Sequence, residues 1–308
     1  MYKPLTIVFA ILLLSGCSFK TTYGWLDWIV PWYVDDYVSL NASQEAVLDH
    51  ELALVLDWHQ REELKRYAAE IEVFRGQIAT QSWTPRQWLE QRSRIQSHQQ
   101  RLLAVVAPGL KKIITSLSEQ QINELLVNVD ESFNDYLDEA EERSDEEWAE
   151  HWQERTEDTV EKWLGRLTSQ QKQLIENWSA VRPYDYEIVR QQGLHWRSLL
   201  KQLLKPRPEH QSELTFQQIF MNDPVTHTDT FATYLKQVRL AYAQLYADLH
   251  PSLTKKQRQH LDRELADWQQ DFIDVANEYE PDTITNDSKE LTHGPSDARP
   301  EQHAAAGG

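Results

Sequence analysis

The chain has 308 residues, of which 49 are Asp or Glu and 31 are Lys or Arg, and its formal net charge is −18. A surface with this charge repels nucleic acid and anionic lipid headgroups, so the composition excludes DNA and RNA as ligand classes. The 12 Trp and 12 Tyr predict a folded core, because disordered acidic chains contain few aromatic residues.

The first sixteen residues have the parts of a bacterial export signal. Lys3 gives a positive start, and an apolar run follows over residues 5–14. A run of about ten residues is too short for a bilayer core, which takes roughly 20 helical residues. The next residues, Leu14-Ser15-Gly16-Cys17, resemble the lipobox of bacterial lipoproteins. We therefore expect a signal peptide at 1–16, cleavage between Gly16 and Cys17, and lipid on the Cys17 thiol. An ordinary secretory signal with a chance cysteine is the alternative.

Cys17 is the only cysteine, so the chain can form no intramolecular disulfide. Lipid attachment would also remove an unpaired thiol from an oxidising compartment. Several acyl chains anchor a protein stably, whereas one chain binds only marginally, and lipoproteins of this class usually carry three. In lipoproteins of Gram-negative bacteria an aspartate after the cysteine favours the inner membrane. By this resemblance Ser18 indicates the outer membrane, with the body facing the periplasm.

An aromatic segment at 17–40 follows the cysteine. It contains Trp25, Trp28 and Trp32, interleaved with acidic residues. Trp favours membrane interfaces, so these three residues are candidates for binding. Because the acidic side chains are poorly suited to headgroups, we expect the segment to fold back and pack its indoles on the body. Contact with the bilayer is the alternative.

The region 41–280 carries repeated helix start signals. An Asn, Ser or Thr that can act as an N-cap is followed three residues later by Gln, the pattern of a capping box. The pattern occurs at Asn41–Gln44, Ser118–Gln121, Thr168–Gln171 and Thr254–Gln257, with variants at Thr84–Gln87 and Ser144–Glu147. These signals predict a helical body at 41–280.

Apolar residues at steps of three and four follow these caps. One such stripe runs from Leu48 to Ile78 and is interrupted only at Gln60. The stripes at 231–249 and 261–279, joined by His250-Pro251-Ser252, predict an antiparallel C-terminal hairpin. We expect an all-α fold, an elongated bundle of roughly eight helices. The tail at 281–308 loses this periodicity, and we expect it to be disordered.

The sequence offers no cofactor motif and no catalytic motif. His59 with Glu62 or Glu63 has metal-ligand chemistry, but two such residues on one helix are common by chance. We interpret Asp57–Glu63 as salt bridges on a helix surface, and the acidic stretch 130–161 as two solvated helix faces. A cation site in that stretch is the alternative, although it lacks the Gly turn of calcium loops.

Two resemblances follow from these motifs. The lipobox, the segment from Trp25 to Tyr37, and the segments Asp57-Trp58-His59 and Arg66-Tyr67-Ala68 resemble an uncharacterised family of lipoproteins from Gram-negative bacteria, domain of unknown function 6279. That family implies the localisation and no activity. Leu167–Gln171 and Leu253–Gln257 are similar to the Leu-Thr-x-x-Gln motif of periplasmic chaperones of the Spy and CpxP type, which implies binding of unfolded clients.

Three functional hypotheses result. The first is a non-enzymatic lipoprotein, anchored through Cys17, whose helix faces bind envelope proteins. The second is a chaperone of envelope proteins. The third is a cell-wall enzyme that uses a pair of carboxylates, although the sequence does not identify the pair.

Overall fold

The computed structural model describes residues 19–80, 82–205, 216–220 and 223–278. The predicted signal peptide, the cleavage site between Gly16 and Cys17, and the predicted tail at 281–308 lie outside the described residues. Within the described ranges every regular element is a helix and no strand occurs, so the prediction of an all-α fold is confirmed.

The helices follow one another with short connections. The first half of the chain contains α2 (Phe19–Tyr23), α3 (Leu26–Asp35), α4 (Ala42–Trp58), the π-helical turn η1 (His59–Glu63), α5 (Leu64–Thr80), α6 (Pro85–Ser116) and α7 (Glu119–Glu141). The second half contains α8 (Asp145–Leu164), α9 (Ser169–Val181), α10 (Tyr186–Leu204), α11 (Phe216–Phe220), the 3₁₀ turn η2 (Pro224–Thr226), α12 (Asp229–Ser252) and α13 (Lys255–Asn277). Because η1 joins α4 and α5 into one continuous rod, the long helices agree with the predicted number of roughly eight. The short helices α2, α3 and α11 come in addition.

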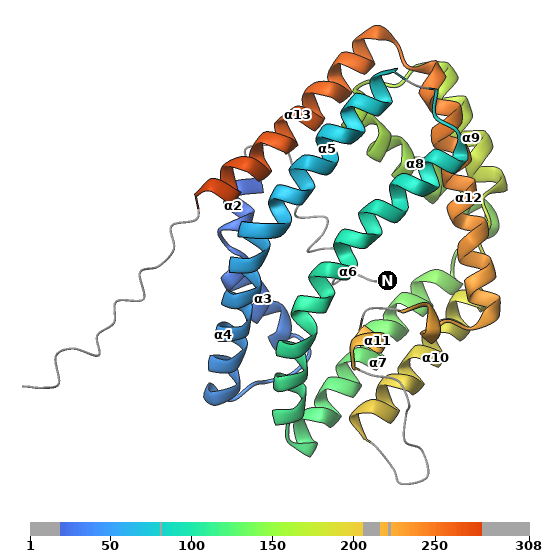
Figure 1. The fold of residues 1–308 in the computed structure, drawn as a ribbon. Coiled ribbons are helices and arrows are strands. Elements are labelled where there is room, and N and C mark those ends of the chain that lie inside the picture. The colour runs from blue at the N-terminus through green and yellow to red at the C-terminus, as the bar shows by residue number, and fades with distance from the viewer. Residues whose placement is uncertain (1–18, 81, 206–215, 221–222, 279–308) are drawn as a thin grey trace, which may run out of the picture.

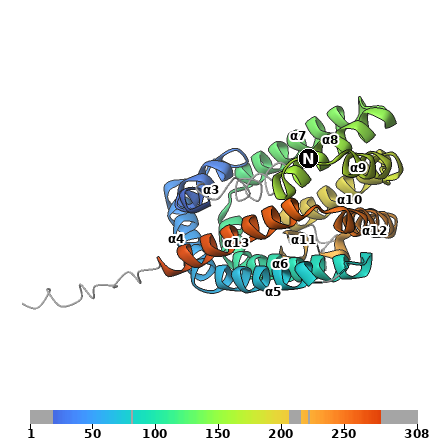
Figure 2. The same ribbon diagram turned by 90° about the horizontal axis from the view of Figure 1, so that it is seen from above.

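The long helix α6 runs through the molecule, between the group that contains α4 and α5 and the group that contains α10 and α12 (Figure 1). It packs on α4 towards one end of the molecule and on α12 towards the other. The last helix, α13, packs along α5 on one side and on α8 on the other. Viewed from above, α13 accordingly lies between α5 and α8 (Figure 2). Both views place α2, α3 and α4 at one end of the molecule.

The buried apolar side chains form three clusters. One joins α2, α5 and α13 and includes Phe19, Leu64 and Trp268. A second joins α8, α9 and α12, and a third joins α6, α7, α10 and α11. A core divided in this way makes each helix depend on its immediate neighbours, as expected for an extended bundle.

The predicted capping boxes are present, and the structure adds that they associate in pairs. The Gln44 and Gln121 amides exchange hydrogen bonds of 3.1 and 2.7 Å, and the Gln171 and Gln257 amides exchange bonds of 3.0 and 2.8 Å. Each Nε2 also donates to a backbone carbonyl just before the partner's cap; Gln121 donates to Ser39 at 2.8 Å and Gln257 to Arg166 at 3.1 Å. Each pair therefore joins two helix N-termini that lie far apart in the sequence.

The predicted C-terminal hairpin is wrong. The connection between α12 and α13 is as short as predicted, but α13 packs on α5 and α8, whereas α12 packs on α6 and α9. The physical reason lies in the apolar stripes, because Trp268 and Val275 of α13 enter the cluster with Phe19 and Leu64, and Leu245 of α12 enters a different cluster. The pairing of Gln257 with Gln171 also fixes the start of α13 against α9.

The Gln171–Gln257 pair provides a test of this arrangement. Gln171 has no exposed surface, and replacing it with Ala removes a capping bond and both hydrogen bonds between the Gln171 and Gln257 amides. We expect Gln171→Ala to lower the free energy of unfolding by about 2 kcal/mol, measured by urea denaturation. Glu147→Ala, at the same position of the exposed capping box of α8, is the matched control and should cost less. Equal losses for the two variants would contradict a structural role for the paired caps.

Candidate functional site

The three tryptophans predicted as binding residues lie on α3 and at its start. Trp25, Trp28 and Trp32 have 58%, 68% and 59% of their surface exposed. The expectation that these indoles pack on the body is therefore wrong. The segment does fold back on the body, but it packs through its other side chains, because Phe19, Tyr23 and Leu26 are only 2%, 8% and 9% exposed.

Helix α2 is fixed in the molecule by aromatic contacts. The ring of Phe19 lies 5.7 Å from that of Trp268 and 5.0 Å from that of Phe272, both on α13. Lys20 forms an ion pair with Glu278, directly after the end of α13. Since Cys17 lies two residues before Phe19 in the sequence, the folded body begins almost at the predicted lipidation site.

A buried polar cluster lies beneath α2, at the π-helical turn η1. The Tyr23 hydroxyl lies 3.1 Å from Nδ1 of His59 and donates to the Leu56 carbonyl at 3.3 Å. Nε2 of His59 lies 3.4 Å from the Tyr67 hydroxyl. Each ring nitrogen of His59 therefore has a hydroxyl as its hydrogen-bond partner, and the neutral imidazole can satisfy both bonds, one as donor and one as acceptor. Burial lowers the pKa of His59 to about 4, outweighing the opposing effect of the nearby Glu63 charge.

Glu63, at the end of the same turn, holds a fully buried carboxylate. Its Oε1 lies 2.5 Å from Nδ1 of His98 and 2.8 Å from Nη2 of Arg101, both on α6. Nε of Arg101 donates to its Oε2 at 3.0 Å. Burial on its own would raise the pKa of Glu63, but the hydrogen bonds and charges of Arg101 and His98 prevail and hold that pKa below its usual value.

The surface interpretation of Asp57–Glu63 is correct only in part. Asp57 and Arg61 do form an ion pair at the helix surface. His59 and Glu63, however, point into the molecule, because the wider π turn changes the direction of the side chains along the rod. The interruption of the apolar stripe at Gln60 was the one sequence signal of this turn. Gln60 donates to the Val275 carbonyl in the last turn of α13 at 2.7 Å.

A hollow of about 330 Å³ lies beside this cluster. Charged residues of α5 and α6 line it, namely Arg66, Glu70, Arg94, His98 and Arg101. Most of these charges are already engaged within the protein, since Arg94 is 2.9 Å from Glu70 and Arg101 is bound to Glu63. The hollow is therefore the solvent-exposed edge of an internal ion-pair network. Its charged side chains mainly hold α6 to η1 and α5.

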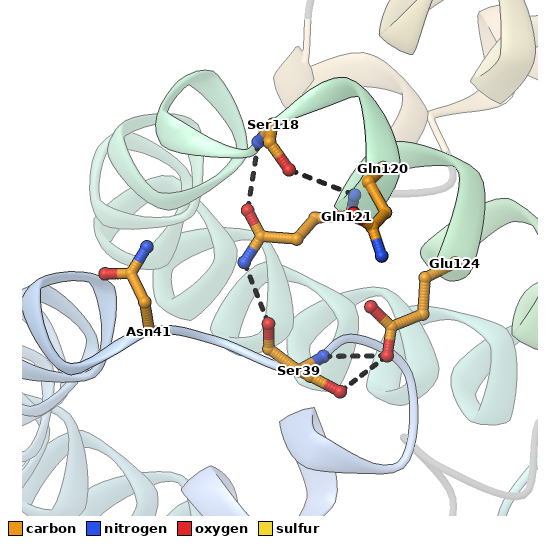
Figure 3. Close-up of a pocket in the computed structure, with 6 residues that line it drawn as sticks. All are labelled: Ser39, Asn41, Ser118, Gln120, Gln121 and Glu124. Carbon is orange, nitrogen blue, oxygen red and sulfur yellow. Dashed lines mark hydrogen bonds between the residues drawn. The ribbon is translucent and has the colours of Figure 1, made fainter.

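A larger hollow of about 560 Å³ lies where the N-termini of α4 and α7 meet. Figure 3 shows hydrogen bonds among Ser39, Glu124, Ser118 and Gln121: Ser39 donates through N and Oγ to Glu124, and Ser118 N donates to Gln121 Oε1 at 2.9 Å. Ser118 and Gln121 belong to the paired caps, and the Ser39 carbonyl accepts a hydrogen bond from Gln121. The Gln residues of both Leu-Thr-x-x-Gln motifs, Gln171 and Gln257, have the same structural role. The motif therefore gives no separate support for a chaperone function.

Two further properties concern metals and membranes. Among the described residues, no group of three or more His, Cys, Asp or Glu is placed to hold a metal ion, and His59 and Glu63 have the partners given above. In the same part of the chain, no helix combines the length and the apolar character needed to cross a bilayer.

A family model described as a family of unknown function (DUF6279) matches residues 36–226. Because this range is more than half of the 308 residues, the chain belongs to that family, as the resemblance predicted. The motifs Asp57-Trp58-His59 and Arg66-Tyr67-Ala68 lie within the matched range, whereas the lipobox lies before it. The matched range includes the whole π turn with Glu63, His98 and Arg101, and it begins after α2 and the three exposed tryptophans. Comparison with curated proteins and with solved structures finds no match.

The neutral state of His59 predicts a pH dependence of stability. Its pKa is about 4 in the folded chain, against the ordinary value of 6.5 for histidine, so between these pH values the unfolded chain binds a proton that the folded chain does not. The free energy of unfolding should therefore fall by about 2 kcal/mol from pH 7.5 to pH 5 on account of this group. Urea denaturation of His59→Phe should show this slope removed, whereas His260→Gln on α13 should keep it. An unchanged slope in His59→Phe would refute the assignment.

Proposed function

We propose that this member of the DUF6279 family is a lipoprotein of the bacterial outer membrane, anchored by lipid on Cys17, whose helical body is a non-enzymatic binding module for envelope proteins. The Leu14-Ser15-Gly16-Cys17 motif supports the anchor. The family match does not include this motif, so the anchor rests on the motif and on the geometry of the residues that follow it.

The observation that carries the proposal is the position of Phe19. Its side chain is 2% exposed and packs on α13, although it lies only two residues after the cysteine. Two extended residues span at most about 7 Å. A lipid on Cys17 would therefore hold the body directly at the membrane surface, with no long tether between them.

The arrangement of polar groups favours binding over catalysis. The buried acid and base side chains, Glu63, His98 and Arg101, are satisfied by one another inside the molecule. The outer faces of α7 and α8 instead present exposed carboxylates, among them Glu131, Asp138 and Glu150. This confirms that the acidic stretch forms solvated helix faces. A module with this charge would select partners that present basic surfaces.

Replacement of the cysteine tests the anchor. The wild-type protein should be recovered in the membrane fraction, and its mature form should carry the added mass of the lipid. Cys17→Ala should remove that mass and leave the protein unprocessed or in the soluble fraction, because no thiol remains to receive the lipid. Ser15→Ala, which keeps a small residue in the motif, is the control. A wild-type protein without lipid at Cys17 would overturn the proposal.

The residue after the cysteine tests the destination. Ser18→Asp should move the lipoprotein from the outer to the inner membrane, measured by separating the two membranes on a sucrose gradient. Ser18→Ala should stay in the outer membrane. If wild-type protein is found in the inner membrane, the anchor stands and the assigned membrane is wrong.

A further inference from the structure

The exposed tryptophans are a selective feature of this molecule. All 12 Trp of the sequence lie within the described residues, and only Trp25, Trp28 and Trp32 are exposed. The others are buried or half-buried, including those of the acidic helix α8. Three large indoles gathered on one short helix form an apolar surface that a monomeric protein does not ordinarily leave in water.

The three indoles share one face of α3. Their spacing of three and four residues places them on the same side of the helix, and the rings of Trp28 and Trp32 lie 6.5 Å apart and nearly parallel, at 9°. On the same helical wheel Asp27 falls on a different side. Asp35 and Asp36 follow at the C-terminal end of the helix, beyond Trp32. By the same spacing, Asp35 and Asp36 fall on the indole side of the helical wheel, so they border the indole face at its C-terminal end. None of the three acidic residues lies between two indoles on that face.

This face is held rigidly. Leu26 at the start of α3 is 9% exposed, and Val38 just after the helix is 5% exposed. α3 packs on α4, and α2 before it is fixed on α13 by Phe19. The indoles therefore point outward because the opposite side of the segment is buried in the body.

The distance along the chain identifies what covers the face. From Cys17 to Phe19 the chain spans at most about 7 Å, and the five residues of α2 add a rise of about 7.5 Å. Trp25 is then within about 15–20 Å of the lipidated sulfur. A lipid on Cys17 enters the bilayer at the headgroup level, so the first surface that α3 can meet is the membrane interface, where Trp is favoured.

We propose that α3 lies on the bilayer surface with Trp25, Trp28 and Trp32 in the headgroup interface, as a second membrane contact that fixes the orientation of the body. This inference rests on the proposed lipid anchor. Asp27, Asp35 and Asp36 are exposed, and the chain carries a net charge of −18, so the surface it fits is zwitterionic rather than anionic. A second copy of the chain, or a protein partner, would be the competing occupant.

Quenching by brominated lipid tests the contact. The purified lipoprotein, with its lipid confirmed by intact mass, is reconstituted into phosphatidylcholine vesicles with or without bromine on the acyl carbons nearest the headgroup. If the twelve Trp contribute equally, the bromine should remove roughly a quarter of the wild-type emission. The triple variant Trp25→Phe, Trp28→Phe, Trp32→Phe should lose almost none. Because these side chains are exposed, the variant should keep the wild-type melting temperature.

The control Trp88→Phe, at the N-terminal end of α6, should be quenched as the wild type is. Lipid on Cys17 without quenching, or equal quenching of wild type and triple variant, would overturn this inference and leave the anchor standing. Absence of lipid would overturn the anchor and the inference together. A wild-type dimer in detergent that the triple variant fails to form, seen by sedimentation, would assign the face to a second copy and also reject the membrane contact.

Discussion

The carboxylate of Glu63 has no exposed surface, and the packing at one end of the molecule follows from the need to neutralise it. A buried charge is tolerated only when it is paired and its remaining lone pairs accept hydrogen bonds. Arg101 and His98 supply both, and both belong to α6. The register of α6 against the rod formed by α4, η1 and α5 is thereby fixed at this point. Removing Arg101 would take away the closest permanently charged partner of this carboxylate and leave a buried charge that is only partly compensated.

The π turn extends this constraint to the N-terminus. The same turn that directs Glu63 towards α6 directs His59 towards Tyr23 of α2 and places Gln60 against the last turn of α13. Helix α2 is consequently part of the folded body, and it determines where α3 and its indoles lie. A chain anchored at Cys17 would thus have an orientation set by its core, because the residues next to the anchor pack into that core.

The local features of this fold are predictable from the sequence, whereas its long-range contacts are not. Capping boxes such as Ser118–Gln121 depend on neighbouring residues, and the structure confirms them. The pairing of the caps depends on contacts between amide groups some eighty residues apart, such as those of Gln44 and Gln121. No local sequence pattern specifies that pairing. The hairpin prediction failed for the same reason, since the apolar stripe of α13 does not by itself specify its partner helix, and in the structure that partner is α5.

The candidate site shows the same division. Trp25, Trp28 and Trp32 were identified from residue type, but their exposure depended on which side of α3 faces the body. The direction of His59 and Glu63 could not be predicted, because one extra residue in a helical turn alters the orientation of side chains and leaves the helical composition unchanged. The interruption of the apolar stripe at Gln60 indicated the position of the turn. It did not indicate that His59 and Glu63 would be buried there with polar partners.

The residues directly after the predicted lipidation site belong to the rigid body, since Phe19, Tyr23 and Leu26 share a core cluster with Leu64 and Trp268. Amide hydrogen exchange of the purified protein, followed by mass spectrometry of its peptides, tests this most directly. Peptides covering 19–35 should exchange as slowly as those of α13, because Phe19, Tyr23 and Leu26 pack in the same cluster as Trp268 and Val275 of α13. Complete exchange of 19–35 within seconds, at the rate of an unfolded linker, would contradict it.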